Sequence, residues 1–261
     1  DKTLRVWDLG SMEEKACLEG HNHWVTSVAI SRDGKTAVSG SWDETLRVWD
    51  LGSMTQKACL EGHRSTPWSV AISEDGKTAV SGSDDETLRV WDLASMTQKA
   101  CLKGDGGPIN SVSISGDGKT AVSGSWSRTL SVWDLGSMTQ KARLEDNSEC
   151  AWSVAISEDG KTAVSGSDDK TLRVWDLGSM TQKARLEGHS KAVGIVAISG
   201  DGKTAVSGSN DETMRVWDLV SMKQKACLEG HSGWVTSVAI SEDGKTAVSG
   251  SGMSTLRVWD L

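Results

Sequence analysis

The chain has 261 residues, a hydrophobic content of 37% and a formal net charge of −8. No run of residues approaches the roughly 18 consecutive apolar positions of a membrane-spanning helix, so we expect no membrane segment. The excess of acidic residues argues against nucleic-acid binding, because that function needs a basic surface to neutralise phosphates.

Two short motifs recur along the chain at one constant interval. The pair Trp-Asp occurs seven times, beginning at Trp7, Trp49 and Trp91 and ending at Trp259. The string DGKTAVSGS occurs six times at the same spacing, beginning at Asp33. A fixed period of this length indicates a solenoid, a propeller or an array of small modules.

Within one period the sequence predicts four short strands in chain order. An apolar run at 70–72 ends at Asp75-Gly76, a dipeptide typical of hairpin turns. A second strand is expected at 78–82, a third at 87–91 and a fourth at 98–102. No stretch has helical periodicity, and a repeated module of four strands favours a propeller.

The repeated string also contains Gly34-Lys35-Thr36, the end of a nucleotide-binding P-loop signature. That signature requires a glycine five residues earlier and a helix afterwards, whose N-terminus holds the phosphate. Ala29 occupies the earlier position, and a strand is expected afterwards. We therefore interpret the string as a hairpin turn and expect no nucleotide or other cofactor.

The motifs in combination resemble the WD-repeat β-propeller family over essentially all 261 residues. The resemblance rests on Gly-His at 20–21, Asp-Gly at 33–34, Ser-Gly-Ser at 39–41 and Val-Trp-Asp at 48–50. It implies an all-β fold of four-stranded antiparallel blades around an axis. Residues 1–261 are expected to form a single WD-repeat domain, a fragment of a longer array.

Two ring closures are compatible with seven Trp-Asp units. In a seven-blade ring, residues 1–20 form part of an incomplete blade that lacks its inner strands. In the alternative, a closed six-blade ring, residues 12–20 supply the outer strand of the last blade and strand 3–9 is surplus. Asp1 would then replace the aspartate that is absent where Met253 stands. Because open strand edges associate readily, we expect the isolated chain to dimerise through them.

The resemblance also implies a hydrogen-bonded group of His, Ser, Asp and Trp in a blade. These residue types match a hydrolase triad, but repetition of the group argues against catalysis, and we expect a structural role with no catalytic residue and no metal site. The complete groups are His21, Ser39, Asp43 and Trp49; His63, Ser81, Asp85 and Trp91; and His189, Ser207, Asp211 and Trp217.

Three repeat units depart from this pattern. One has Asp105 in place of His and Ser127 in place of Asp, another has Asn147 in place of His, and the last has Met253 in place of Asp. A lost hydrogen bond in such a network costs about 1 kcal/mol. We therefore expect the blade that holds Asp105 and Ser127 to be locally the least stable.

Six of the 13 tryptophans lie outside the Trp-Asp pairs, in two loops per repeat that vary in sequence. The resemblance places both loops on one rim of the ring. For four of these tryptophans packing between blades and exposure are equally expected, whereas Trp42 and Trp126 are expected to be exposed. With two acidic neighbours they form the predicted partner-binding set: Trp24, Trp42, Trp68, Asp84, Trp126, Trp152, Asp168 and Trp234.

These features predict a non-enzymatic scaffold that binds a protein or a basic peptide on the Trp-rich rim. The alternative is binding of a small ligand or carbohydrate on the same rim. The cysteines predict a reducing, cytoplasmic setting, with the nucleus as an alternative. Four of the five share one phase of the repeat, which keeps them too far apart for disulfides, and they are expected to fill outer strands as small apolar residues: Cys17, Cys59, Cys101 and Cys227.

Overall fold

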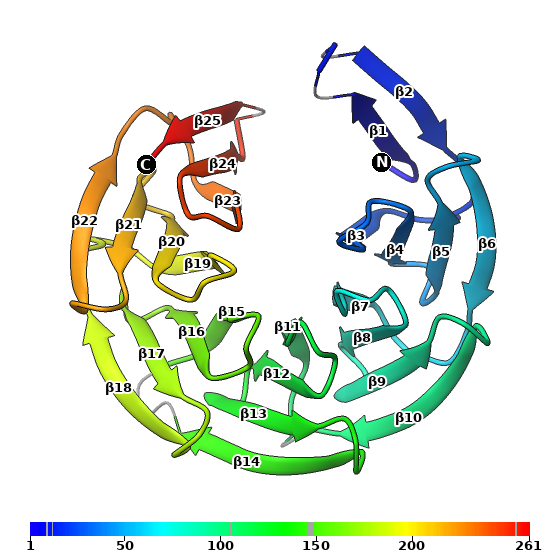
Figure 1. Cartoon of the computed structure of the whole chain (residues 1–261), viewed down its shortest axis with the longest axis horizontal. Helices are drawn as coiled ribbons and strands as arrows, with labels where there is room; N and C mark the ends of the chain where they lie inside the picture. The colour runs from blue at the N-terminus through cyan, green and yellow to red at the C-terminus, as the bar shows by residue number, and fades with distance from the viewer. Residues whose placement is uncertain (9, 12, 105, 146–148, 254) are drawn as a thin grey trace. The chain divides into compact units, whose positions relative to one another are not determined.

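The computed structural model describes residues 1–8, 10–11, 13–104, 106–145, 149–253 and 255–261. It divides into two compact units, Asp1–Val112 and Ser113–Leu261, which are described separately below. The described residues form strands and turns throughout (Figure 1). Within this part of the chain there is no helix with the length and apolar character that a membrane span needs.

The strands repeat in the predicted order. The chain opens with β1 (Leu4–Asp8) and β2 (Glu13–Leu18). First strands of the repeat are β3 (Val25–Ile30), β7 (Pro67–Ile72), β11 (Ile109–Ile114), β15 (Ala151–Ile156), β19 (Val193–Ile198) and β23 (Val235–Ile240). Second strands are β4 (Thr36–Ser41), β8 (Thr78–Ser83), β12 (Thr120–Ser125), β16 (Thr162–Ser167), β20 (Thr204–Ser209) and β24 (Thr246–Ser251).

Third strands carry the Trp-Asp pair, and fourth strands follow them. The third strands are β5 (Leu46–Asp50), β9 (Thr87–Asp92), β13 (Thr129–Asp134), β17 (Leu172–Asp176), β21 (Met214–Asp218) and β25 (Leu256–Asp260). The fourth strands are β6 (Thr55–Leu60), β10 (Thr97–Lys103), β14 (Thr139–Glu145), β18 (Thr181–Leu186) and β22 (Lys223–Leu228).

Consecutive strands pair into antiparallel sheets, each of which is one blade. The first unit contains the hairpin β1–β2 and the four-stranded sheets β3–β6 and β7–β10. Strand β11, in which the unit boundary falls, begins the sheet β11–β14. The second unit continues with the four-stranded sheets β15–β18 and β19–β22 and the three-stranded sheet β23–β25.

The structure corrects the seven-blade expectation in part. Six sheets contain the inner strand pair of a blade, and residues 1–20 contribute only the hairpin β1–β2. The six-blade alternative placed residues 12–20 on the last blade, but that sheet, β23–β25, has three strands and β2 pairs with β1. Strand β2 pairs with β1, with Leu18 opposite Leu4, and Asp1 accepts hydrogen bonds from Thr3. Dimerisation through open strand edges stays a prediction.

Neighbouring blades pack face to face through one recurring set of apolar side chains. In the first unit, Val38, Leu46, Val48 and Leu60 of one sheet meet Val70, Ala79 and Trp91 of the next. In the second unit, the equivalent residues of β16–β18 meet Val193, Val196, Ala205 and Trp217. The glycine of Ser-Gly-Ser permits this packing, because a Cβ on Gly208 would lie 2.5 Å from a methyl carbon of Val235.

The Asp-Gly-Lys-Thr segment forms a hairpin turn, as the sequence predicted. Gly34 has a positive φ, a left-handed conformation that glycine adopts without strain. The amide of Ser31 donates to the carbonyl of Thr36, and the Ser31 hydroxyl donates to the Asp33 carboxylate. Strand β4 begins at Thr36, so the segment lacks the helix of a phosphate-binding loop.

Candidate partner-binding site

A chain of hydrogen bonds joins four side chains inside the blade β3–β6. His21 Nδ1 lies 2.9 Å from Asp43 Oδ2, and His21 Nε2 lies 2.8 Å from Ser39 Oγ. The indole N–H of Trp49 donates to the same Ser39 oxygen at 2.8 Å. The two other complete groups have the same connections, within His63, Ser81, Asp85 and Trp91 and within His189, Ser207, Asp211 and Trp217.

The positions of the protons in this hydrogen-bonded group follow from which of its atoms can donate. Nδ1–H of His21 donates to the Asp43 carboxylate, and the Ser39 hydroxyl donates to Nε2 while accepting from Trp49. If the imidazole of His21 were charged, both its Nε2–H and the indole N–H of Trp49 would donate to the Ser39 oxygen. The hydroxyl proton of Ser39 would then have no acceptor within the group. The geometry therefore favours neutral histidine.

Burial acts in the same direction on the titration of these groups. Burial lowers the pKa of His21 below 6.5, although the Asp43 carboxylate opposes this effect. Burial also disfavours ionised Asp43, but hydrogen bonds from Thr45, the amide of Asn22 and His21 outweigh it and lower the pKa of Asp43 to about 2. The group thus pairs a neutral imidazole with an ionised carboxylate at neutral pH.

The departing repeat units use other partners. His231 Nδ1 lies 3.0 Å from Thr255 Oγ1, which takes the place of the aspartate that Met253 replaces. In β15–β18, Asp169 forms a buried ion pair with Arg173 at 2.9 Å. Ser127 contacts the hydroxyls of Ser125 and Thr129. Asp105 and Asn147 lie outside the described residues. The expected low stability of the blade that holds Asp105 and Ser127 therefore stays a prediction.

The six tryptophans of the variable loops are all exposed. Their exposed fractions range from 37% for Trp152 to 59% for Trp234, whereas the Trp-Asp tryptophans of the five four-stranded sheets are 1–3% exposed. Packing between blades, which the sequence left open for four of them, does not bury these rings. The six are Trp24, Trp42, Trp68, Trp126, Trp152 and Trp234.

In the first unit, the exposed rings form one aromatic cluster. The ring centroids of Trp24 and Trp42 are 4.9 Å apart, and those of Trp42 and Trp68 are 6.1 Å apart. His23 stacks on Trp42 with a centroid distance of 5.2 Å. His23 was not among the predicted partner-binding residues, although its place between His21 and Trp24 in a variable loop could have indicated it. Asp84 is exposed on the next loop, where its carboxylate accepts from Ser65.

In the second unit, two of the exposed rings border a shallow cavity. Trp152, Asp168 and Trp234 line a space of about 230 Å³ together with Asn210. Trp126 contacts Trp152 edge to face at 6.1 Å. The structure thus brings the second-unit tryptophans and Asp168 into one neighbourhood. Among the residues described, no three His, Cys, Asp or Glu side chains gather as ligands of a metal ion would.

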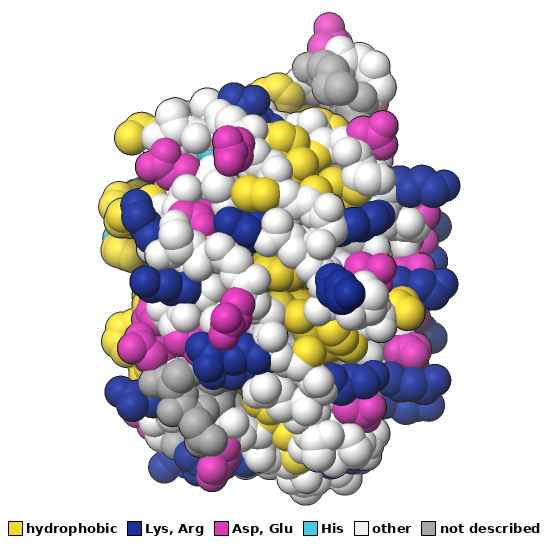
Figure 2. All heavy atoms as spheres, turned by 90° about the vertical axis from the view of Figure 1, so that its left-hand side faces the viewer, with side chains coloured by type: hydrophobic (Ala, Val, Ile, Leu, Met, Phe, Trp, Pro, Cys, Tyr) yellow, Lys and Arg dark blue, Asp and Glu magenta, His cyan; other side chains and the backbone are white. Residues whose placement is uncertain are grey.

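Charge on the surface is mixed. On the face shown in Figure 2, Lys and Arg side chains are interspersed with Asp and Glu, and neither sign forms a continuous area.

The four cysteines of the fourth-strand phase are exposed on β2, β6, β10 and β22 and are not disulfide-bonded. Their expected role as apolar fillers is therefore wrong, because alternate residues of these outer strands face solvent.

Comparison with known proteins gives one family and several relatives. A sequence model described as "IFT122 first beta-propeller" matches residues 1–260. The small ribosomal subunit protein RACK1 of Caenorhabditis elegans is 45% identical over 53 residues, which cover 17% of this chain and 16% of that protein. The cross-pathway control WD-repeat protein 2 of Flammulina velutipes is 50% identical over 48 residues, 16% of this chain and 15% of that protein. Each alignment thus covers about a sixth of the relative.

Proposed function

Because the chain is a WD-repeat β-propeller of the IFT122 first β-propeller family, we propose that it is a non-enzymatic scaffold that binds a protein or peptide through its exposed tryptophans. Relatives named as small ribosomal subunit proteins are parts of a larger assembly, which supports a protein partner. A cytoplasmic location is proposed together with this role.

The exposed indoles carry the proposal. The cluster of Trp24, Trp42, Trp68 and His23 presents four exposed rings in the first unit, in which His23, Trp24 and Trp42 contact one another and Trp68 contacts Trp42. Tryptophan is enriched at binding hot spots, since it supplies a large contact area with few rotatable bonds. Exposed aromatic rings in contact are costly in water, and a bound partner would remove that cost.

The chemistry of these surfaces fits a basic segment of the partner. An Arg or Lys side chain packs over an indole face by cation–π attraction, which contributes about 0.5–2 kcal/mol. In the second unit, the cavity beside Trp152 and Trp234 adds the Asp168 carboxylate, which can pair with the same cation. Asp84 offers a carboxylate near the first-unit cluster. The variable loops also contain the basic residues Arg64, Arg128 and Lys170, which would repel a basic peptide. The test below therefore compares peptides of different charge.

The histidine groups support a structural role and not a catalytic one. Ser39 is fully buried and its hydroxyl is engaged by both His21 and Trp49, so a substrate carbonyl has no path to it. The same holds for Ser81 and Ser207, which are also fully buried. A satisfied buried network of this kind fixes the geometry of a blade.

The test is a fluorescence titration of the protein with peptides that differ only in charge: a basic, a neutral and an acidic series of one length. The proposal expects saturable quenching by the basic series and a loss of at least tenfold in affinity in the double variant Trp42→Ala/Trp126→Ala. A matched variant, Lys35→Ala/Lys119→Ala, changes two exposed turn residues at the other end of the strands and should bind normally. Equal binding by both variants contradicts the proposal, and quenching by simple sugars alone would favour the carbohydrate alternative.

A further inference from the structure

The shallow cavity of the second unit is lined by residues at positions where other repeats carry a tryptophan. The equivalent residues, counted at the repeat interval, are Ala192 and Trp234 with Trp24, Gly194 and Trp152 with Trp68, and Asp168 and Asn210 with Trp42. The cavity is therefore built from the differences between repeats, and not from the residues that all repeats share.

Backbone hydrogen bonds fix two of these three positions relative to each other. The amide of Asn210 donates to the carbonyl of Ala192 at 3.0 Å, and the amide of Asp168 donates to the carbonyl of Cys150 at 3.4 Å. The same bond joins Trp42 to Trp24 in the first unit at 2.9 Å. A change of residue at these positions thus alters the lining and leaves the two loops in register.

The blade β19–β22 leaves the cavity open because it carries small residues at two of these positions. Gly194 and Ala192 stand where the neighbouring blades carry Trp152 and Trp234. A Cβ on Gly194 would have no atom of the described residues within 4 Å, so a side chain there would enter open space. Strands β15 and β23 lie on either side of β19, and each brings one of the two indoles to this gap (Figure 1).

Two polar side chains in the cavity are half-buried and lack a partner within the described part of the chain. There the Asp168 carboxylate accepts no hydrogen bond and forms no ion pair, whereas the carboxylate of the next residue, Asp169, is paired with Arg173. The side-chain amide of Asn210 is likewise without a hydrogen bond to these residues. A half-buried carboxylate is stabilised by a cation that donates hydrogen bonds to it.

We propose that this cavity receives one arginine side chain of the partner. Its volume of about 230 Å³ is below the roughly 300 Å³ at which pockets for whole small molecules begin, and suits a single side chain. The guanidinium lies beside the indoles of Trp152 and Trp234 and donates to the side-chain oxygens of Asp168 and Asn210. This inference rests on the proposed function, because it names the residue of the partner that enters this site.

Arginine fits the lining better than lysine. A guanidinium is planar and weakly hydrated, so it can stack on an indole face while its N–H groups donate in its own plane to Asp168 and Asn210. An ammonium is a compact, strongly hydrated charge that gains less from the same surfaces. Exposed Lys170 and Lys191 belong to the two loops that border the cavity, and they repel further cations. The site therefore selects one arginine and not a run of basic residues.

The probe is a labelled glycine–serine peptide with one central arginine, compared by fluorescence polarisation with versions that carry lysine or citrulline at that place. The arginine peptide should bind at least tenfold more tightly than either. Lysine keeps the charge but loses the planar hydrogen bonds, and citrulline keeps the planar shape but loses the charge. The ratio of arginine to lysine affinity reports on this cavity separately from binding at the other tryptophans.

Two variants should remove this preference. Asp168→Asn removes the charge with little change of shape, and Gly194→Trp fills the gap with the side chain that Trp152 has at the equivalent position. In each variant the arginine-to-lysine ratio should fall below about twofold. Glu242→Gln is the matched control, since it removes one exposed acid from the Asp-Gly turn at the other end of β23 and should leave the ratio unchanged. Circular dichroism checks that the variants are folded.

The outcomes separate this inference from the proposed function. Equal affinity for the arginine and lysine peptides, or an unchanged ratio in both Asp168→Asn and Gly194→Trp, would overturn the inference alone when the basic series still binds. If neither the basic series nor the arginine peptide binds up to about 1 mM, the proposed function fails with it. Displacement of the arginine peptide by simple sugars would overturn the inference in favour of a carbohydrate ligand.

Discussion

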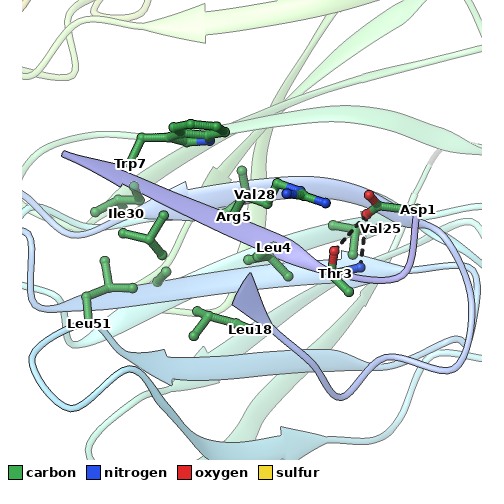
Figure 3. A pocket seen from close by; sticks show the side chains of 12 residues that line it. Asp1, Thr3, Leu4, Arg5, Trp7, Leu18, Val25, Val28, Ile30 and Leu51 are labelled. Atoms are coloured by element: carbon green, nitrogen blue, oxygen red, sulfur yellow. Dashed lines mark hydrogen bonds between the residues drawn. The ribbon is translucent and has the colours of Figure 1, made fainter. Parts of the chain in front are cut away.

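Val28 and Val70 hold equivalent positions in strands β3 and β7, yet Val28 is 54% exposed and Val70 is 6% exposed. The two residues sit in almost identical local sequences, so the difference comes from the sheet that lies against each of them. Val70 packs on Val38 and Leu46, whereas Val28 borders an apolar groove lined by β1 and β3 (Figure 3). Stability in this repeat protein is therefore decided at the interfaces between blades.

This difference predicts unequal costs for one chemical change. Val70→Ala removes two buried methyl groups and should lower the free energy of unfolding by about 2 kcal/mol. Val28→Ala should lower it by less than about 0.5 kcal/mol, since its methyl groups are already hydrated. Urea unfolding followed by tryptophan fluorescence measures both. Equal losses in the two variants would show that the groove is filled in solution.

The stability lost when the serine of a hydrogen-bonded group is removed should depend on how many side chains it bonds. Ser81→Ala removes the hydrogen-bond partner of His63 Nε2 and of the indole N–H of Trp91, although His63 Nδ1 keeps its bond to Asp85. With two groups unsatisfied, the loss should be about 3 kcal/mol. Ser123→Ala affects a repeat unit that has no histidine, where the hydroxyl accepts from Trp133. That change should cost about 1 kcal/mol. Thermal unfolding of the two variants compares them, and a larger loss for Ser123→Ala would contradict the account.

Acid should weaken the fold in two steps. Burial lowers the pKa of His21, His63 and His189 below the ordinary 6.5, so the unfolded chain binds more protons than the folded chain below that pH. Stability is therefore full above about pH 6.5 and declines as the pH falls. A second loss follows below pH 3.8, because the pKa of Asp43 is lowered to about 2 in the fold.

Urea unfolding at pH 8, 7, 6 and 5 measures the first step. The triple variant His21→Gln/His63→Gln/His189→Gln is the control, since it removes the titrating groups and should show a shallower decline over this range. Stability that rises between pH 7 and pH 5 would be incompatible with buried neutral histidines.

Two turn residues in each four-stranded blade hold a left-handed conformation without being glycine. In the turn before the third strand these residues are Glu44, Glu86, Arg128, Lys170 and Glu212, and in the turn before the fourth strand they are Met54, Met96, Met138, Met180 and Met222. Asparagine tolerates this region better, so Glu44→Asn should raise the free energy of unfolding by about 0.5 kcal/mol. Glu61→Asn, at an exposed position outside this set, should change it little. Equal effects of the two changes in thermal unfolding would count against the conformational explanation.

The repeat made the local fold predictable from the sequence. Period, turn dipeptides and Trp-Asp pairs predicted four strands per repeat, and the structure confirms their order and antiparallel pairing. The Asp-Gly-Lys-Thr turn was likewise interpreted correctly, because Ala29 ruled out a phosphate loop. These features depend on residues close together in the sequence, and the local pattern contains them.

Features that depend on neighbouring sheets were not predictable in the same way. The sequence predicted that residues 1–20 could form part of an incomplete blade, but it left open whether residues 12–20 would join the last blade instead; in the structure β2 pairs with β1. The exposed cysteines were placed wrongly, since sequence phase does not tell which side of an outer strand is covered. Thr255 as the partner of His231, and the ion pair of Arg173 with Asp169, are local repairs that side-chain geometry alone reveals.

The central claim, that a partner binds the exposed tryptophans, is tested most directly by cross-linking. A basic peptide from the titration series, carrying a photoreactive group, is irradiated with the protein, and the attached residues are identified by mass spectrometry. The account predicts cross-links around Trp24, Trp42 and Trp68 or around Trp152 and Trp234, suppressed by excess unlabelled peptide. Cross-links confined to the Asp-Gly turns, such as 33–36, or to the outer strands β6 and β10 would contradict it.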